Sequence, residues 1–120
     1  MKILVVDDEQ IIRDLASKIL TRAGYETELA ESGREGIERF NAACDDIGLV
    51  LLDLSLSDVA GIDALREIRR IAPGVPCILS SGRTLEEGEV PAEVADKTCF
   101  LEKPYRSRQL ADMVRELIEI

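Results

Sequence analysis

The stretch Leu49-Val50-Leu51-Leu52-Asp53-Leu54-Ser55 decides the fold of this chain. Four apolar residues without polar alternation precede Asp53, which is typical of a strand buried on both faces of a parallel sheet. Asp53 then lies where the strand ends, beside the crevice in which open parallel sheets bind ligands. Taken alone, such an aspartate more simply caps a helix or closes a turn. The rest of the chain decides between these interpretations.

Four further apolar runs predict strands, and the segments between them have helical periodicity. The predicted strands are residues 3–6, 25–29, 49–52, 75–80 and 98–101. Ser32 and Glu35 have the spacing of a capping box, which predicts the start of a helix. Strands that alternate with helices five times predict an α/β fold, with one doubly wound parallel sheet of five strands and about five flanking helices. The length of 120 residues fits a single domain over residues 1–120.

The segment 83–97 departs from this regular pattern. It is rich in glutamate, but Gly88 and Pro91 interrupt any long helix. We expect a short or irregular helix there. After it, the last helix is predicted to place a regular apolar face on the sheet, formed by Leu110, Met113, Val114, Leu117 and Ile118.

The composition excludes several classes of function. The formal net charge is −9, from 15 basic and 24 acidic residues, which disfavours direct binding to nucleic acid or to an anionic membrane. The chain has no histidine, so it has neither a Ser-His nor a Cys-His nucleophilic pair and cannot carry a phosphohistidine. Cys77 and Cys99 lie in apolar segments and are expected to be small buried core residues. No run has transmembrane length and no signal peptide is recognisable, so we expect a cytoplasmic location.

Polar residues follow four of the five predicted strands at the point where each strand ends. Asp7 and Asp8 follow the first strand, Asp53 the third, Ser81 the fourth and Lys103 the fifth. The carboxyl ends of parallel strands meet at one edge, so these side chains are expected to converge there. Each of them has an ordinary interpretation by itself, as a helix-start acid, a turn residue or a surface lysine. The combination is more specific than any member.

The expected cluster predicts a cation. Two carboxylates about 4 Å apart repel each other by roughly 4 kcal/mol at an effective dielectric constant near 20. With oxygen ligands only, a hard ion such as Mg²⁺ is expected. A carboxylate beside Mg²⁺ and Lys103 can act as a nucleophile toward a phosphoryl group.

With these residues in view, the chain resembles the receiver domain of two-component response regulators over its whole length. The matching motifs are Val5-Val6-Asp7-Asp8-Glu9, Leu51-Leu52-Asp53 with Gly61 downstream, Ser80-Ser81-Gly82 and Lys103-Pro104-Tyr105. The resemblance implies a flavodoxin-like sheet with the strand order 2-1-3-4-5. It also implies a phosphorylation-dependent signalling switch that assists its own phosphorylation and dephosphorylation, rather than an enzyme.

The resemblance assigns roles around a phosphoryl group. Asp53 would be the phosphoacceptor, and Lys103 would pair with the bound phosphate. Ser81 looks like the switch hydroxyl that moves to the phosphate. Phe100, three residues before Lys103, occupies the position of the aromatic side chain that rotates with it.

The resemblance also assigns a metal site. Asp7 or Asp8, together with Asp53 and the backbone carbonyl of Ser55, would hold Mg²⁺. Asp8 looks like the more direct ligand of the two.

The partners are likewise implied by the family. A sensor histidine kinase would donate the phosphoryl group from its phosphohistidine, and a downstream output domain or protein would receive the signal. A homodimer through the last helix stays open. The sequence around Ser81 and Lys103 is similar to that of receivers at the C-terminus of hybrid sensor histidine kinases. Such a parent kinase would be an enzyme, and it would tether the domain to the membrane.

The sequence departs from the family pattern at several positions. Ser57 stands where proline is usual, which predicts a looser loop after Asp53. Ser55 and Arg83 occupy the positions that tune how long the phosphoryl group survives, so its lifetime is open. Gly88 and Pro91 lie where the fourth helix, part of the usual output face, is expected.

Three alternatives have different sequence requirements. An aspartate-nucleophile phosphatase or phosphotransferase of the haloacid-dehalogenase type needs a second aspartate at the position of Ser55. A degenerate receiver that acts only as a binding module does not need the intact set of Asp53, Ser81 and Lys103. A flavin-binding protein of similar topology needs a phosphate-cradling glycine-rich loop after the first strand, and this sequence has none.

Overall fold

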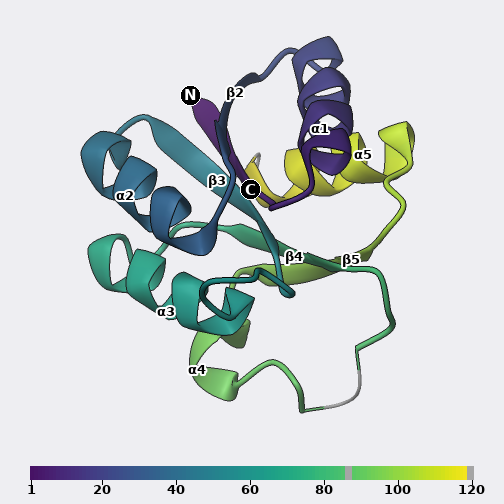
Figure 1. The fold of residues 1–120 in the computed structure, drawn as a ribbon. Coiled ribbons are helices and arrows are strands. Elements are labelled where there is room, and N and C mark those ends of the chain that lie inside the picture. The colour runs from purple at the N-terminus through teal and green to yellow at the C-terminus, as the bar shows by residue number, and fades with distance from the viewer. Residues whose placement is uncertain (86–87, 119–120) are drawn as a thin grey trace.

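The computed structural model describes residues 1–85 and 88–118, and over these residues five strands alternate with five helices (Figure 1). The strands are β1 (Lys2–Val6), β2 (Glu26–Ala30), β3 (Ile47–Asp53), β4 (Cys77–Ser81) and β5 (Thr98–Glu102). The helices are α1 (Gln10–Arg22), α2 (Gly33–Ala43), α3 (Gly61–Ile71), α4 (Ala92–Ala95) and α5 (Ser107–Ile118). The predicted alternation is therefore confirmed.

The strands form one parallel sheet in the order β2-β1-β3-β4-β5. This confirms the predicted fold and strand order. β3 lies in the middle, with Leu52 opposite Val6 of β1 and Asp53 opposite Ser80 of β4. Because every strand runs in the same direction, the polar residues at the strand ends come to the same edge.

Two strands begin later than the sequence suggests, for reasons visible in the backbone. The N–H of Tyr25 donates to the carbonyl of Leu20 at 3.0 Å and helps to close the end of α1, so β2 begins one residue later. Pro76 has no N–H to give to the sheet. Its carbonyl accepts from Val50 at 3.1 Å, but β4 itself begins at Cys77.

The helices cover both faces of the sheet (Figure 1). On one face, α1 and α5 pack over a core that includes Ile3, Leu20 and Leu110. On the other face, α2, α3 and α4 pack over a core that includes Phe40, Leu52 and Leu65. β3 contributes alternate side chains to both cores, which explains the unbroken apolar run before Asp53.

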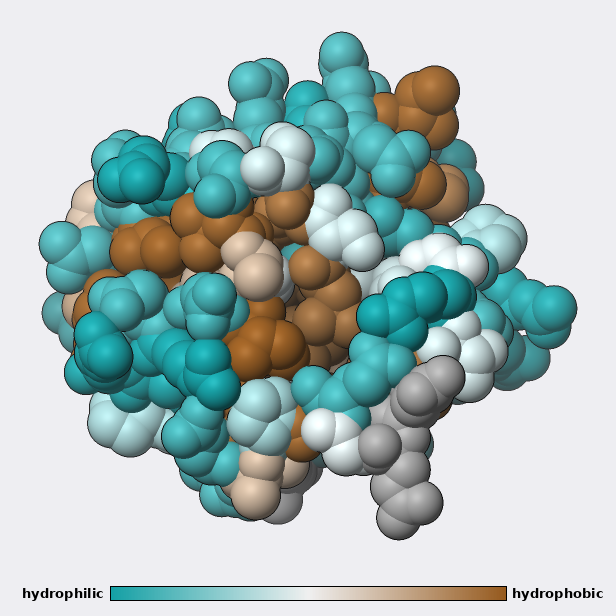
Figure 2. All heavy atoms as spheres, turned by 60° about the horizontal axis from the view of Figure 1, so that its bottom comes forward, coloured by the Kyte–Doolittle hydropathy of each residue, from teal (hydrophilic) through white to brown (hydrophobic). Residues whose placement is uncertain are grey.

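The short α4 agrees with the short or irregular helix expected in the segment 83–97. Residues 86 and 87 of this segment lie outside the described part of the chain. The guanidinium group of Arg69 links α3 by hydrogen bonds to the segment before β4 and to the backbone around α4. It donates to the carbonyls of Val75, Val94 and Lys97 at 2.9, 3.4 and 3.2 Å. On this face of the molecule, apolar side chains gather in a hollow bordered by hydrophilic ones (Figure 2). A helix of four residues leaves more of the sheet uncovered than a longer one.

The three cysteines are free thiols. Cys77 is buried, as predicted, and burial raises the pKa of its thiol to about 12. The prediction of a buried core residue was wrong for Cys99, which is only half-buried. Cys99 lies on β5, an edge strand with a neighbour on one side only. Among the described residues, no helix is long and apolar enough to span a membrane.

Candidate functional site

Asp53 is a buried carboxylate at the end of β3, with 3% of its surface exposed. Its Oδ1 accepts a hydrogen bond from the N–H of Ser55 at 3.0 Å. Gly61 lets α3 begin directly against this strand end, because a Cβ there would lie 2.5 Å from the carbonyl oxygen of Asp53. The N–H of Gly61 donates to the carbonyl of Leu54 at 3.1 Å, which fixes both ends of the loop 54–60.

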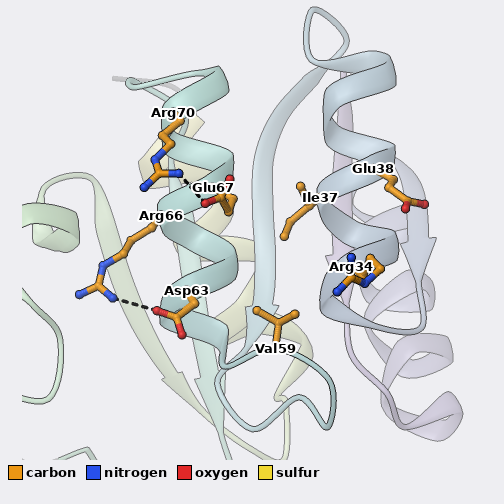
Figure 3. Close-up of a pocket in the computed structure, with 8 residues that line it drawn as sticks. All are labelled: Arg34, Ile37, Glu38, Val59, Asp63, Arg66, Glu67 and Arg70. Carbon is orange, nitrogen blue, oxygen red and sulfur yellow. Dashed lines mark hydrogen bonds and ion pairs between the residues drawn. The ribbon is translucent and has the colours of Figure 1, made fainter.

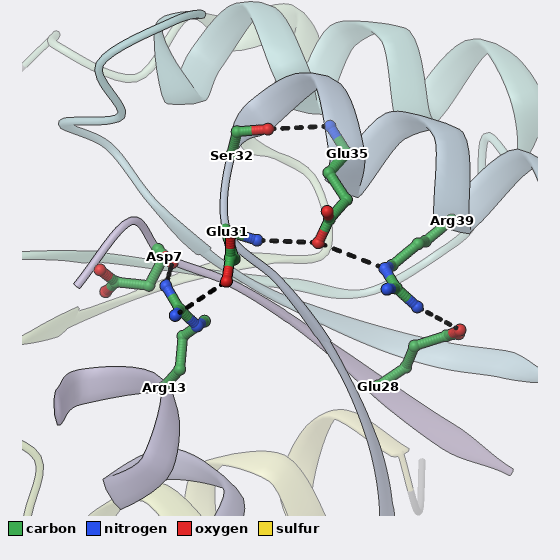
Figure 4. Close-up of polar contacts among 7 residues, drawn as sticks. All are labelled: Asp7, Arg13, Glu28, Glu31, Ser32, Glu35 and Arg39. Carbon is green, nitrogen blue, oxygen red and sulfur yellow. Dashed lines mark hydrogen bonds and ion pairs between the residues drawn. The ribbon is translucent and has the colours of Figure 1, made fainter. Parts of the chain in front are cut away.

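The end of β1 brings three more carboxylates to the same edge. Asp7 is buried, and its Oδ1 accepts from the N–H of Glu9 at 2.9 Å. Asp8 and Glu9 are exposed. Arg13 of α1 donates from Nη1 to the carbonyl of Asp7 at 2.7 Å, so this loop is held from below (Figure 4).

One carboxylate oxygen from each of four residues lies within 4.8 Å of the others, and these residues are Asp7, Asp8, Glu9 and Asp53. The predicted convergence of Asp7, Asp8 and Asp53 is thus present. Glu9 was missed as a site residue, although it stands in the acidic run after the first strand. An all-oxygen donor set of this kind fits a hard divalent cation.

Lys103 is the cation within this cluster. Its Nζ lies 2.8 Å from Asp7 Oδ2, 3.3 Å from Asp53 Oδ2 and 3.6 Å from Glu9 Oε1. Burial of the ammonium group disfavours its charge. The hydrogen bond to Asp7 and the charges of Asp53 and Asp7 outweigh that effect and raise the pKa of Lys103 above its usual range.

The surroundings of Asp53 disfavour its charged form, whereas those of Lys103 favour the charged form of the lysine. Burial raises its pKa, the hydrogen bond from Ser55 lowers it, the charge of Asp7 raises it and Lys103 lowers it, and the net direction is upward. Burial and repulsion thus exceed what Ser55 and Lys103 supply to the ionised form. A second positive charge near Asp53 and Asp7 would favour that form.

Ser81 ends β4 at the same edge. Its carbonyl accepts from the N–H of Lys103 at 2.8 Å, which joins β4 to the start of the last loop. Its Oγ accepts from the N–H of Arg83 at 3.2 Å, so the hydroxyl proton remains available to another acceptor.

A buried hydrogen bond lies behind these residues and was not anticipated. The hydroxyl of Tyr105 donates to Ser80 Oγ at 2.8 Å, and burial is the main cause that raises the pKa of Tyr105 to about 12. It ties the loop after Lys103 to β4. No local sequence pattern signals a pair separated by 25 positions.

Phe100 does not join the carboxylate cluster. It lies within β5 opposite Leu79, half-buried, and packs against the core on the α3 and α4 side. Its rotation with Ser81 stays a prediction.

A separate groove of about 620 Å³ lies between α2 and α3. Figure 3 shows its charged walls, where Arg66 pairs with Asp63 at 2.8 Å and Arg70 with Glu67 at 2.7 Å. None of the four clustered carboxylates lines it. The four clustered carboxylates therefore lie at the strand ends and not in this groove.

Comparison with known proteins agrees with this geometry. The family described as "Response regulator receiver domain" matches residues 3–115. The chain is 30% identical to the chemotaxis protein CheY of Thermotoga maritima, over 97% of this chain and 96% of that protein. It is 32% identical to the alkaline phosphatase synthesis transcriptional regulatory protein SphR of Synechococcus elongatus, over 98% of this chain and 48% of that protein. The chain thus spans about half the length of SphR, and likewise about half of the transcriptional regulatory protein CusR of Escherichia coli.

Solved structures give the same result. A receiver domain protein described as CheY-like from Methanospirillum hungatei superposes with a TM-score of 0.88 at 30% identity, covering 98% of this chain and 93% of that one. The receiver domain of the hybrid histidine kinase CckA superposes with a TM-score of 0.84 at 25% identity, covering 98% of this chain and 99% of that one.

Proposed function

Because the chain belongs to the family of response regulator receiver domains, we propose that Asp53 is the residue on which it accepts a phosphoryl group. The domain is a phosphorylation-dependent switch of two-component signal transduction, like the CheY and response regulator proteins that it matches. The observation that carries the assignment is the position of Asp53, buried at the end of β3 and 3.3 Å from Lys103.

The proposed step transfers a phosphoryl group from a histidine imidazole to the carboxylate of Asp53. A carboxylate oxygen of Asp53 forms a bond to phosphorus while the bond from phosphorus to the imidazole nitrogen of a phosphohistidine breaks. The electron pair of that bond stays on the departing imidazole. Lys103 stabilises the negative charge on the phosphoryl oxygens throughout.

Asp7, Asp8, Asp53 and the backbone carbonyl of Ser55 are the residues that we propose to hold Mg²⁺. When bound, the ion supplies positive charge that reduces the repulsion between the carboxylates and the incoming phosphate. Glu9, which has a carboxylate oxygen within 4.8 Å of those of Asp7, Asp8 and Asp53, would be a further candidate to hold the ion. Between them, these residues orient Asp53 for attack.

Ser81 and Lys103 are the proposed sensors of the new phosphate. A hydrogen bond to a charged group contributes about 1.5–3 kcal/mol net, so two of them contribute roughly 3–6 kcal/mol. A two-state equilibrium moves from 1:99 to 99:1 with about 5.5 kcal/mol. At the upper end of this range the two contacts supply the free energy that resets the conformation near β4, and Phe100 is the aromatic side chain that we propose to follow Ser81.

The partners belong to the same proposal. The phosphodonor is the phosphohistidine of a sensor histidine kinase in the cytoplasm, and the recipient of the signal is an output domain or protein. The similarity to the CckA receiver supports, as an extension, an origin in a hybrid sensor kinase. The reading frame upstream of Met1 tests that origin directly.

The test is the intact mass of the protein after incubation with acetyl phosphate and Mg²⁺. We expect one phosphoryl adduct that disappears in EDTA and in Asp53→Asn. Asp45→Asn, which removes an exposed aspartate just before the start of β3, at the opposite end of that strand from Asp53, is the matched control and keeps the adduct. An unmodified wild-type protein, or an adduct that survives in Asp53→Asn, contradicts the proposal. Turnover of a generic phosphate ester would instead favour a phosphatase.

A further inference from the structure

The loop 54–60, which follows Asp53, is fastened to a helix far away in the sequence. Asp58 Oδ1 accepts from the N–H of Gly33 at 2.9 Å, and Asp58 Oδ2 accepts from the N–H of Arg34 at 3.0 Å. Figure 3 shows the next residue, Val59, beside the end of α2 that carries Arg34. The loop therefore rests on the first turn of α2.

This contact completes the start of α2. A helix leaves its first N–H groups without partners inside the helix. Asp58 satisfies the first two of them, and the N–H of Glu35 donates to Ser32 Oγ at 3.1 Å. A negative charge at a helix start also interacts favourably with the helix dipole. In agreement, the backbone hydrogen bonds from Arg34 and Gly33 lower the pKa of Asp58.

The packing around Gly33 shows how close the approach is. A Cβ at Gly33 would lie 3.1 Å from Val59 Cβ, 3.3 Å from Asp58 Oδ1 and 3.3 Å from Leu56 Cδ1. Leu56 is itself buried. Both polar and apolar atoms of the loop thus meet the glycine at the first position of α2.

We call the cluster of Asp7, Asp8, Glu9 and Asp53 the acidic site. The segment 31–34 is also linked, through Arg13, to the loop after β1, which carries the first three of these residues. Glu31 lies 3.6 Å from Nη2 of Arg13, and Nη1 of Arg13 donates to the carbonyl of Asp7 at 2.7 Å (Figure 4). The two loops that carry the carboxylates therefore share one support. Asp58 is the link on the side of Asp53, and Arg13 is the link on the side of Asp7.

We propose that Asp58 is a positioning residue of the acidic site, which fixes the loop 54–60 on α2 so that Asp53 and Ser55 face Asp7 and Asp8. Ser57 provides no rigidity of the kind that a proline would give, and the two hydrogen bonds of Asp58 are what fasten the loop to α2. A loop held in its binding geometry loses less conformational entropy when the cation binds. The inference deepens the proposed function, because it rests on the assignment of the acidic site as a metal site.

The test measures binding of Mg²⁺ alone, by titration calorimetry without a phosphodonor, for the wild type, Asp58→Ala, Asp58→Asn and Asp63→Asn. Asp63 is the matched control, because it is an acidic residue in the first turn of α3 whose carboxylate accepts from the guanidinium group of Arg66 and not from the backbone of α2. We expect Asp58→Ala to weaken Mg²⁺ binding by about tenfold, the lower end of the effect of removing groups that orient metal ligands. Asp58→Asn keeps one accepting oxygen and should lie between Asp58→Ala and the wild type.

A purely structural role is separated from positioning by thermal unfolding of the same variants. Loss of a helix cap alone lowers the melting temperature but leaves the Mg²⁺ dissociation constant of the folded protein unchanged. An unchanged dissociation constant in folded Asp58→Ala overturns the inference. Should that variant fail to fold, wild-type affinity in Asp58→Asn overturns it instead.

Failure of the proposed function gives a different result. If the wild type binds no Mg²⁺, the metal assignment fails, and the amide exchange of Ser55 without metal then tests the fastening by itself. Faster exchange in Asp58→Ala than in Asp63→Asn supports the positioning role, and equal exchange overturns it. If the wild type forms the Asp53 adduct while Asp58→Ala binds Mg²⁺ normally, the function stands and only the inference falls.

Discussion

Lys103 balances the charge of the acidic site, and replacing it by methionine tests this directly. The substitution keeps a long side chain and removes the ammonium group that lies 2.8 Å from Asp7 Oδ2 and 3.3 Å from Asp53 Oδ2. At an effective dielectric constant of 20, these distances correspond to attractions of about 6 and about 5 kcal/mol. Burying the ammonium group offsets part of that gain. Removal of one partner from a buried ion pair costs about 3–5 kcal/mol, and we expect a loss of unfolding free energy in this range.

The assay is urea denaturation at pH 7 in EDTA, followed by the same measurement with saturating Mg²⁺. Lys18→Met removes an exposed lysine of α1 and is the control. The variant without Lys103 leaves the carboxylates without their cation, so it should gain more stability from Mg²⁺ than the wild type does. An ion at a hundred times its dissociation constant adds about 2.7 kcal/mol.

Two results would refute this reasoning. One is a loss below about 1 kcal/mol in Lys103→Met, which is the contribution of an exposed ion pair. The other is a smaller Mg²⁺ stabilisation in the variant than in the wild type, since it would mean that the lysine and the metal do not act on the same carboxylates.

Three further predictions follow from neighbouring contacts. Asp53→Asn should raise the melting temperature at neutral pH without metal, because the raised pKa shows that the ionised group is disfavoured in the folded protein. The difference in melting temperature between Asp53→Asn and the wild type is largest above the pKa of Asp53 in the folded protein and shrinks as the pH falls toward the ordinary value of 3.8. A difference that does not depend on pH would contradict this prediction. Tyr105→Phe should lower the unfolding free energy in urea by about 1–3 kcal/mol, because it leaves the buried Ser80 hydroxyl without its donor, and no loss would show that the pair is dispensable. Gly61→Ala places a methyl group 2.5 Å from the Asp53 carbonyl oxygen, so it should cost about 1–3 kcal/mol in thermal unfolding, whereas Gly82→Ala, in open space, should show no such clash.

The sheet was predictable because each strand corresponds to an apolar run that can be recognised from the local sequence alone. The apolar run before Asp53 is long enough to require burial on both faces, and the alternation of strands with helices then places the strand ends together. Asp7, Asp8, Asp53 and Lys103 follow from that topology alone. The short α4 was also predictable, since Gly88 and Pro91 lie within the segment.

The supports of the site were not predictable, because they depend on pairs distant in sequence. Asp58 meets Gly33 across 25 positions, and Tyr105 meets Ser80 across another 25. Neither pair has a local pattern, and an aspartate in a loop most simply suggests a turn. Only the packing of the loop 54–60 on α2 reveals the first contact. The sequence suggested a looser loop at Ser57, and the two hydrogen bonds of Asp58 show how this loop is held without a proline.

The position of the phosphoryl group within the chain tests the central claim most directly. The protein is incubated with acetyl phosphate and Mg²⁺, reduced with borohydride, which converts an acyl phosphate of aspartate to homoserine, and then digested for peptide mass analysis. We predict homoserine at position 53 and unchanged aspartate at positions 7, 8 and 58. Homoserine at any of those three positions with Asp53 intact, or no homoserine in a protein that carries the adduct, would contradict the account.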